Sequence, residues 1–405
     1  MAFNDGQADA ALHAAWNQFC DRLRDAGEQV WKEANPSTPA LRADAFRFLT
    51  QNLGQAFDLA LETKNTAYPL IHPFCTPTRK LGCDAADLSY RQAWIDGTHR
   101  YRVTGTRGTS RFFNIAVQGA RAERDALHEP FGDKPEANLF GHQLACAADG
   151  TFELFVGGEE RKPNWLPTTR ASRKLFIREG FDGWEETPSA LTIERLNMDA
   201  PRPMPSADDM ITAMAWAGDF LSGMMRDWPE HPYRFSGGVV DPALPNQFPP
   251  DRSANNVDDA KRGRLAAHMV WTLERDEALI VTFDAHAGFW MVSLGGVFMN
   301  SFDYLYRPVS YTPARTHIDT DGKVRLVLAH DDPGYHNWLD TQGFECGNLT
   351  YRNLLTQTPT SLSTQLIRRA DLERTLPQDS VMVTKAQRLE QMHTRFAAIR
   401  RRFGL

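Results

Sequence analysis

Short runs of alternating apolar and polar residues fill two stretches of this chain, and the runs repeat. An Asp-Gly pair opens residues 149–156, and an Asn-Trp-Leu triplet occupies residues 164–166. The same order returns at residues 321–328 and 337–339. Alternation with a period of two predicts strands, and an Asp-Gly pair predicts the tight turn of a hairpin. Both stretches are therefore expected to contain β hairpins.

The match between the two stretches extends in both directions, which predicts a duplicated β module. The further matching pairs are residues 101–103 with 279–281, 112–117 with 289–294, and 175–178 with 349–352. A repeat has to be recognised before the fold is assigned. What the two copies share is expected to be structural, and what only one copy contains is where function should be sought.

Helical spacing of apolar residues marks the ends and the middle of the chain. The pattern predicts helices over residues 8–32, 41–61, 210–221 and 385–402, with Ser206 near the third as its N-cap, and a further helix over 258–273. We predict a mainly β fold with α additions, in which a jelly-roll or sandwich-like module occurs twice. The expected units are a helical N-terminal unit (1–66), a first β module (67–200), a helical insert with an irregular loop (201–275), a second β module (276–356) and a C-terminal segment ending in a helix (357–405).

Composition narrows the class of protein. The 405 residues carry a net charge of −6, which argues against nucleic-acid binding because that needs a basic surface. The locally basic end of the chain, with Arg395 and residues 400–402, is expected to be the solvated face of the last helix. The N-terminal residues show no basic and apolar pattern of a secretory signal, and the apolar runs are shorter than a membrane span, so neither a signal peptide nor a membrane span is expected. Five scattered cysteines are typical of free thiols in a reducing compartment, so a cytoplasmic location is expected.

The first copy resembles the uncharacterised family called domain of unknown function 1214. The resemblance rests on residues 112–117, on Ala-Asp-Gly at 148–150, on Pro-Asn-Trp-Leu-Pro at 163–167 and on residues 175–178. Residues 332–340 resemble a diverged version of the same module, so the family motif occurs twice. The resemblance implies a jelly-roll-like β domain and supplies no reaction and no catalytic residue.

The second copy is rich in titratable groups where the first is not, and its candidate catalytic residues are His330, His336, Asp331 and Asp340. A histidine beside a carboxylate can move a proton near neutral pH. His317 lies upstream and is a further candidate. Two other interpretations stay open. His330, His336 and Asp331 can be ligands of a divalent metal, although their spacing matches no standard motif. The segment can also be a polar turn with solvated histidines.

Candidate substrate-binding residues are Tyr351, Arg352, Trp338, Asn337 and Arg170. A paired arginine can bind a carboxylate, and a tryptophan can stack on a flat ligand. The Asn-Trp pair is equally typical of a structural corner, in which the amide holds a turn. No nucleotide, Ser-hydrolase or zinc-protease motif is present, so no cofactor is predicted.

These residues favour an enzyme that acts on a small, partly apolar organic metabolite, hydroxylated or glycosidic, by acid/base chemistry of lyase, isomerase or hydrolase type. The alternative is a non-catalytic ligand-binding or assembly protein with an aromatic pocket between the two β modules, since pockets favour such junctions. A small-molecule ligand is the expected partner in both cases. Nucleic acid and membrane are not expected partners, and self-association of the chain stays open.

Overall fold

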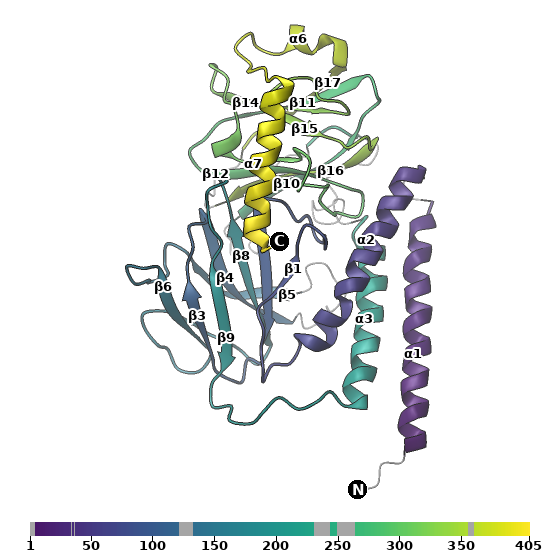
Figure 1. Cartoon of the computed structure of the whole chain (residues 1–405), viewed down its shortest axis with the longest axis vertical. Helices are drawn as coiled ribbons and strands as arrows, with labels where there is room; N and C mark the ends of the chain where they lie inside the picture. The colour runs from purple at the N-terminus through teal and green to yellow at the C-terminus, as the bar shows by residue number, and fades with distance from the viewer. Residues whose placement is uncertain are drawn as a thin grey trace.

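The fold was established from a computed structural model of the chain, which describes residues 5–33, 35, 37–120, 133–230, 244–248, 264–354 and 360–405. Two β sandwiches lie end to end, with three long helices along one side and a fourth across their junction (Figure 1). The predicted fold class, mainly β with helical additions, is confirmed. No described helix is long and apolar enough to cross a membrane.

The first sandwich consists of a five-stranded and a four-stranded sheet. Across the larger sheet the order is β1 (His72–Cys75), β2 (Leu88–Trp94), β8 (Ser172–Gly180), β4 (Phe112–Ala120) and β5 (Asp133–Phe140). Across the smaller it is β7 (Trp165–Leu166), β6 (Thr151–Val156), β3 (Tyr101–Thr106) and β9 (Ala190–Arg195). Inward side chains such as Val103, Ile115, Leu154 and Ile177 meet in one core between the sheets.

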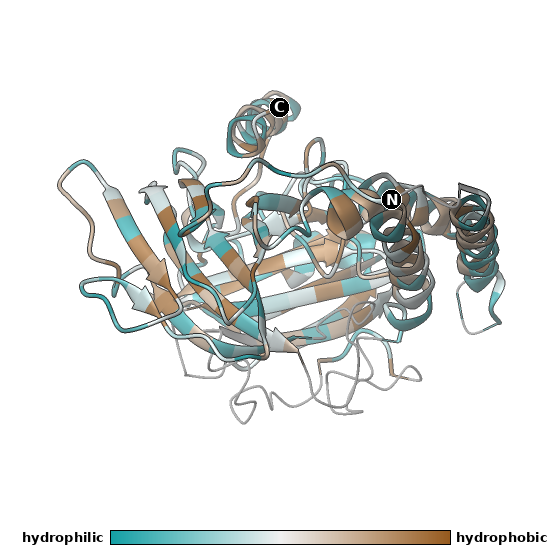
Figure 2. Ribbon diagram, turned by 90° about the horizontal axis from the view of Figure 1, so that it is seen from below, coloured by the Kyte–Doolittle hydropathy of each residue, from teal (hydrophilic) through white to brown (hydrophobic). Residues whose placement is uncertain are grey.

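The second sandwich consists of two four-stranded sheets. One has the order β10 (Arg264–Thr272), β16 (Cys346–Leu354), β12 (Phe289–Gly295) and β13 (Ser310–Tyr311). The other has the order β15 (Trp338–Asp340), β14 (Lys323–Ala329), β11 (Glu277–Asp284) and β17 (Ser363–Arg368). Apolar and polar bands alternate along the strands of the protein (Figure 2), as a sheet with one buried face requires.

The pairing of the strands shows that the two sandwiches are copies of one module. In the first copy β3 pairs antiparallel with β6 and β9, and β7 joins β6 in parallel. In the second, β11 pairs antiparallel with β14 and β17, and β15 joins β14 in parallel. The predicted duplication is therefore present in strand order and direction as well as in sequence.

The Asn-Trp-Leu triplet forms the same structural corner in both copies. The side-chain amide of Asn164 donates to the carbonyl of Ala145 (2.8 Å) and accepts from its N–H (2.9 Å), and it also donates to a carbonyl of β6 (2.9 Å). Asn337 makes the same bonds to His317 (2.8 and 2.9 Å) and to a carbonyl of β14 (3.0 Å). Each neighbouring indole donates to a backbone carbonyl, at 3.3 and 3.1 Å. An amide that satisfies three backbone groups at once fixes this turn.

One predicted helix is wrong. Within the described part of residues 258–273 the chain forms β10, which pairs with β16 from Arg264 to Thr272. Met269 and Trp271 are fully buried and face the core of the second sandwich. That sandwich therefore begins N-terminal of residue 276, and through β17 it also extends beyond residue 356. The five-part division of the chain stays a prediction.

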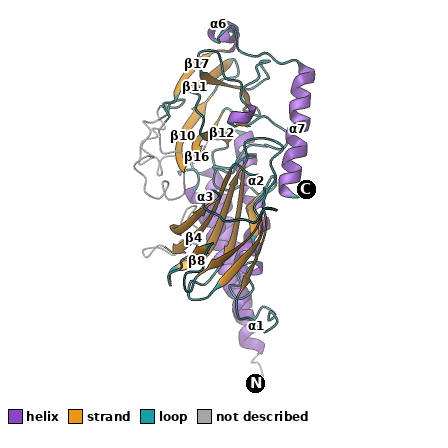
Figure 3. Ribbon diagram, turned by 90° about the vertical axis from the view of Figure 1, so that its left-hand side faces the viewer, coloured by secondary structure: helices purple, strands orange, loops and turns teal. Residues whose placement is uncertain are grey.

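Three helices pack beside the strands (Figure 3) and share a hydrophobic core with Trp94 of β2 and with Phe298. They are α1 (Asp5–Glu28), α2 (Pro39–Phe57) and α3 (Ala207–Asp227). The predicted cap of α3 is present as a capping box between Ser206 and Asp209. Trp216 and Trp228 are buried in this helical core, so these aromatic side chains do not line a pocket between the sandwiches.

Short helical turns complete the fold. They are η1 (Gln29–Trp31), η2 (Asp58–Glu62), η4 (Pro313–Arg315), η5 (Arg369–Asp371) and α6 (Leu372–Thr375). Of these, η4 matters for function because it places Arg315 at the boundary between the sandwiches. There it meets Asp182 of the first sandwich, whose carbonyl accepts from Arg315 Nε at 3.1 Å.

The last helix, α7 (Lys385–Phe403), starts beside the second sandwich and ends beside the first (Figure 1). The prediction that its arginines form a solvated face is wrong for Arg395 and Arg402, which are 3% and 6% exposed, and holds for Arg400 and Arg401. Both buried guanidinium groups donate to backbone carbonyls. Arg395 donates to Ser310 of the second sandwich (2.9 Å), and Arg402 donates to Gly183 of the first. The helix thus joins the two copies through charged groups.

Candidate functional site

The structure separates the four residues predicted to be catalytic. His330 lies at the end of β14, where its Nε2–H donates to the carbonyl of Leu273 (3.0 Å) and its Nδ1 accepts from Thr341 (2.9 Å). His336 lies at the other end of the loop and contacts different partners. Neither histidine is bonded to the carboxylate expected to orient it, so the predicted histidine–carboxylate pair is not formed.

The two predicted carboxylates form ion pairs with arginines. Asp331 is exposed and lies 3.2 Å from Arg369. Asp340 is 1% exposed and lies 3.0 Å from Arg307. Burial raises the pKa of Asp340, against the opposing effects of a backbone hydrogen bond from Gln342 and of Arg307. The ligand set predicted for a metal, His330 with His336 and Asp331, is likewise not assembled.

The predicted substrate-binding residues are mostly interior. Asn337 and Trp338 form the corner described above. The hydroxyl of Tyr351 donates to Asn353 (2.6 Å) inside the second sandwich. Arg352 is 2% exposed and donates to the carbonyl of Cys83 (2.6 Å). Arg170 lies exposed in the turn before β8. None of these five residues lines the cavity described next.

His336 lines a cavity of about 400 Å³ at the junction of the two sandwiches. Trp184 enters from the first sandwich, and Tyr311, Arg315 and His317 come from the second. A third part of the lining comes from α7, which contributes Arg395 together with Gln391 and Met392. A cavity of this size is in the range of small-molecule sites and lies where such sites often occur, between two domains.

His336 is held as a neutral imidazole. Its Nε2–H donates to the carbonyl of Arg315 (3.1 Å), and its Nδ1 lies 3.2 Å from the amide nitrogen of Gln391. Arg388 donates to the oxygen of that same amide (2.8 Å), so the amide nitrogen is left to donate to His336. Burial lowers the pKa of His336, and the positive charge of Arg388 lowers it further. Both ring nitrogens are therefore engaged at neutral pH.

Three arginines surround one buried carboxylate next to the cavity, and two of them, Arg315 and Arg395, line it. Asp87 is fully buried, with Arg315 Nη2 at 2.6 Å and Arg402 Nη1 at 3.6 Å from its Oδ1. Arg395 is the third cation close enough to act on it. All three guanidinium groups lie over the ring of Trp184, at 4.0, 5.1 and 5.1 Å from a ring centroid. The tryptophan face thus stabilises a crowded set of cations.

Positive charge exceeds negative charge in this cluster. Burial alone would raise the pKa of Asp87, but Arg315, Arg395 and Arg402 outweigh it and hold the pKa below its usual value. Burial and repulsion from Arg315 lower the pKa of Arg395 to about 10. The pKa of Arg402 is also lowered to about 10, mainly by burial and despite the attraction of Asp87. An anion in the cavity would relieve this repulsion.

The cluster contains residues that the sequence analysis did not select: Asp87, Trp184, Arg315, Arg395 and Arg402. One signal for it was present. Arg388, Arg395 and Arg402 are spaced seven residues apart, so they lie on one face of the helix. All three are buried. The partners of that face come from distant parts of the chain, and no spacing in the sequence indicates them.

Comparison with known proteins supports the fold and leaves the chemistry open. A crystal structure of an uncharacterised protein from Burkholderia cenocepacia is 28% identical, covers 90% of this chain and 100% of its own, and superposes with a TM-score of 0.81. A protein from Vibrio parahaemolyticus is 10% identical over 86% of this chain and 100% of its own, with a TM-score of 0.43. Oxalate decarboxylase of Bacillus subtilis is 8% identical over 72% of this chain and 73% of its own, with a TM-score of 0.15. No family model matches the chain. No curated protein matches it.

Proposed function

We propose that this protein binds a small organic anion with a partly apolar body in the junction cavity. The observation that carries the proposal is that Arg315 and Arg395 line the cavity, and that with Arg402 behind them they outnumber the one carboxylate they surround, Asp87. Buried charges are stable when they are paired, and a carboxylate or phosphate is the natural partner of a guanidinium group.

The rest of the cavity lining suits the apolar body of a ligand. Trp184, Tyr311 and Met392 line it beside the arginines. The Tyr311 hydroxyl donates to the carbonyl of His336, so its polar end is already bonded and its ring is left for contact. A ligand with an anionic end and a flat or aliphatic remainder matches this division of the walls.

Acid/base catalysis on the same ligand is the second candidate, and one observation favours it. His336 is neutral in the cavity, which is the protonation state that a general base requires. Its Nδ1 accepts from the Gln391 amide, so a substrate would have to displace that amide before taking its place. An isomerase or lyase that moves a proton next to a carboxylate is the reaction type that fits these groups.

The test is a thermal-shift and calorimetric screen of small carboxylic acids and phosphates, each paired with its neutral amide or ester. We expect some anions to bind while the neutral partners do not. An anion at a hundred times its Kd adds about 2.7 kcal/mol to stability. Binding of the neutral partner with equal affinity would show that the arginine charge is not what selects the ligand.

A cavity-filling variant locates the binding. Met392→Trp enlarges a half-buried side chain on the α7 wall without changing any charge, and His393→Ala changes its exposed neighbour. We expect Met392→Trp to abolish anion binding and His393→Ala to leave it intact. Binding that survives Met392→Trp would place the ligand elsewhere. Turnover of a bound anion, lost in His336→Ala while binding persists, would establish the catalytic candidate.

A further inference from the structure

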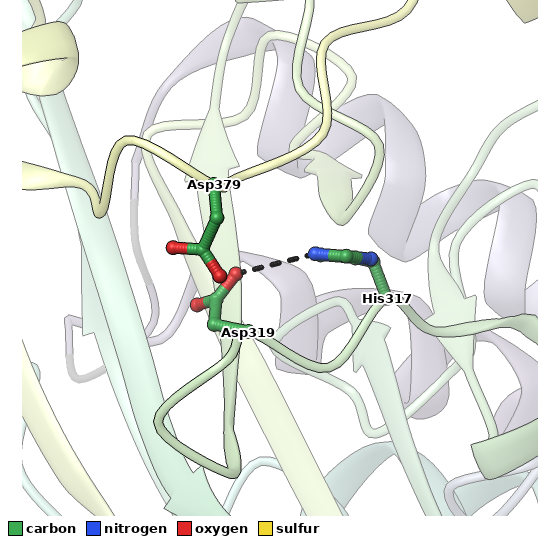
Figure 4. A group of neighbouring side chains, drawn as sticks. All are labelled: His317, Asp319 and Asp379. Carbon is green, nitrogen blue, oxygen red and sulfur yellow. Dashed lines mark ion pairs between the residues drawn. The ribbon is translucent and has the colours of Figure 1, made fainter.

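A second group of ligand-type side chains lies beside the cavity and is distinct from the arginine cluster. His317, Asp319 and Asp379 come from two segments far apart in the chain and point toward one another (Figure 4). One nitrogen of the imidazole and one oxygen of each carboxylate lie within 4.8 Å of one another. Ligand atoms bound at about 2.1 Å from one cation lie within about 4.2 Å of each other. Small side-chain rotations therefore suffice to bring all three onto a cation.

The atoms that face the centre of this group retain lone pairs for a cation. The His317 Nε2 is buried and has no hydrogen-bond partner in the described part of the chain, and it lies 3.6 Å from Asp319 Oδ1. That separation is too long for a hydrogen bond. Arg325 binds the other oxygen of Asp319, Oδ2, at 2.6 Å. Asp379 accepts from the N–H of Thr320 through its Oδ2 (2.6 Å).

The first copy of the module supplies an internal comparison. Asn164 holds both backbone groups of Ala145, as Asn337 holds those of His317. Two residues further on, Ala147 makes the backbone bonds of the hairpin turn to residues 150 and 151, as Asp319 does to residues 322 and 323. The positions of His317 and Asp319 are therefore occupied by alanine in the first copy. The corner folds without an imidazole or a carboxylate there, so the fold does not require these side chains.

The second copy has also gained the third group. Asp379 lies in the segment between α6 and α7, which crosses the hairpin of the second sandwich. Its neighbour Ser380 donates to Asp319 Oδ1 at 3.3 Å and so holds this segment against the hairpin. Backbone hydrogen bonding from Thr320 lowers the pKa of Asp379, which keeps it ionised at neutral pH. Two carboxylates and one imidazole nitrogen form a mixed oxygen and nitrogen donor set.

We propose that His317, Asp319 and Asp379 bind a divalent transition-metal cation such as Zn²⁺, Mn²⁺ or Co²⁺. One nitrogen and two oxygen donors suit borderline cations better than Ca²⁺ or Mg²⁺, which prefer all-oxygen sets. Arg325 offsets part of the carboxylate charge, so the site presents less than two full negative charges to the cation. The site does not depend on what the junction cavity binds, and it replaces the metal ligands His330, His336 and Asp331 expected from the sequence.

The experiment uses the full chain, freed of metal with a chelator and titrated with Zn²⁺ or Co²⁺ alone. Calorimetry gives the stoichiometry, and the visible absorption of Co²⁺ reports nitrogen and oxygen ligation. We expect one cation per chain and a melting temperature that rises with the cation. His317→Ala introduces the residue found in the first copy, and Asp379→Asn removes one charge from a half-buried side chain. Each should weaken binding at least tenfold.

The matched control is His393→Ala, which removes an exposed histidine on α7 and should leave affinity unchanged. The proposal is overturned if the wild-type chain binds no cation, or if His317→Ala and Asp379→Asn both bind as tightly as the wild type. Loss of binding in His393→Ala would likewise assign the cation to the surface of α7. Should His317→Ala fail to fold, Asp379→Asn decides the question through the same titration and the same shift in melting temperature.

Discussion

The substitution Asp87→Asn should destabilise the protein more than any exchange of a surface carboxylate. Asp87 is fully buried, and Arg315 and Arg402 lie 2.6 and 3.6 Å from its Oδ1. Asparagine has nearly the same volume, so the change removes the negative charge and leaves packing intact. The three guanidinium groups then face one another with no carboxylate among them.

The magnitude follows from the cost of an unpaired buried charge. Removing one partner of a buried ion pair costs about 3–5 kcal/mol. The charged form of Arg395 is disfavoured even with Asp87 present, since burial and Arg315 lower the pKa of Arg395 to about 10. This lowering of the pKa disfavours the charged form of Arg395 by about 3 kcal/mol. Loss of the Asp87 charge increases this penalty, so we expect the upper half of the range.

Urea unfolding at pH 7, followed by circular dichroism, measures the free energy of unfolding in both forms. The control is Asp276→Asn, which breaks an exposed pair with Arg368 at 2.8 Å and should cost less than about 1 kcal/mol. A loss for Asp87→Asn no larger than that of the control would refute the view that Asp87 is the counterion of the cluster. An anionic ligand of the cavity should restore part of the lost stability.

Two further predictions concern the corner and the histidines. Asn164→Ala and Asn337→Ala each remove three hydrogen bonds to the backbone, so each should lower the free energy of unfolding by about 2–3 kcal/mol. Thermal unfolding measures this change, and a loss of stability in one copy alone would contradict the equivalence of the two corners. Burial lowers the pKa of His336, His72 and His286, so the unfolded chain binds more protons and stability should fall as pH drops below about 6.5. His336→Asn should flatten this decline when the free energy of unfolding is measured from pH 7.5 to 5, and an unchanged slope would rule out its contribution.

The duplicated module could be predicted because its strands and turns are specified by residues that lie close together in the sequence. Alternating side chains and Asp-Gly turns are local signals, and two copies in the same order reinforce each other. The corner asparagine is also local, since Asn164 and Asn337 bond to backbone groups within about twenty residues, at Ala145 and His317. Features that depend on short stretches of chain are the ones that sequence patterns reveal.

The helix expected over residues 258–273 shows where local patterns fail. Leucine, alanine and methionine are good helix formers, and they are frequent in this stretch. Pairing with β16 overrides that preference, because Met269 and Trp271 gain full burial only as inward residues of a strand. Two of the outward residues of β10, Ala266 and Val270, are also apolar and obscure the alternation.

The residues predicted to be catalytic do not lie together, for a related reason. Sequence identifies titratable residues but not their partners, and partners decide whether a side chain is structural. His330 is bonded to Leu273 and Thr341, and Asp340 to Arg307, over separations of 11 to 57 residues. Of the candidates, His336 and His317 line the cavity. The other lining residues come from the first sandwich, from η4 and its flanking residues and from α7, so no pattern in the segment around His336 could indicate them.

The location of the two proposed sites follows from the duplication itself. A residue that both copies need for folding, such as the corner asparagine, cannot change without loss of the module, so it is not expected to take part in binding or catalysis. His317 and Asp319 stand where the first copy has alanine, so they can change without loss of the module. The cavity requires Trp184 of one copy, Arg315 of the other and the helix that joins them. A single copy would lack the opposing wall and would leave Asp87 without Arg315 and Arg402, so binding at the junction is a property that only the joined pair can have.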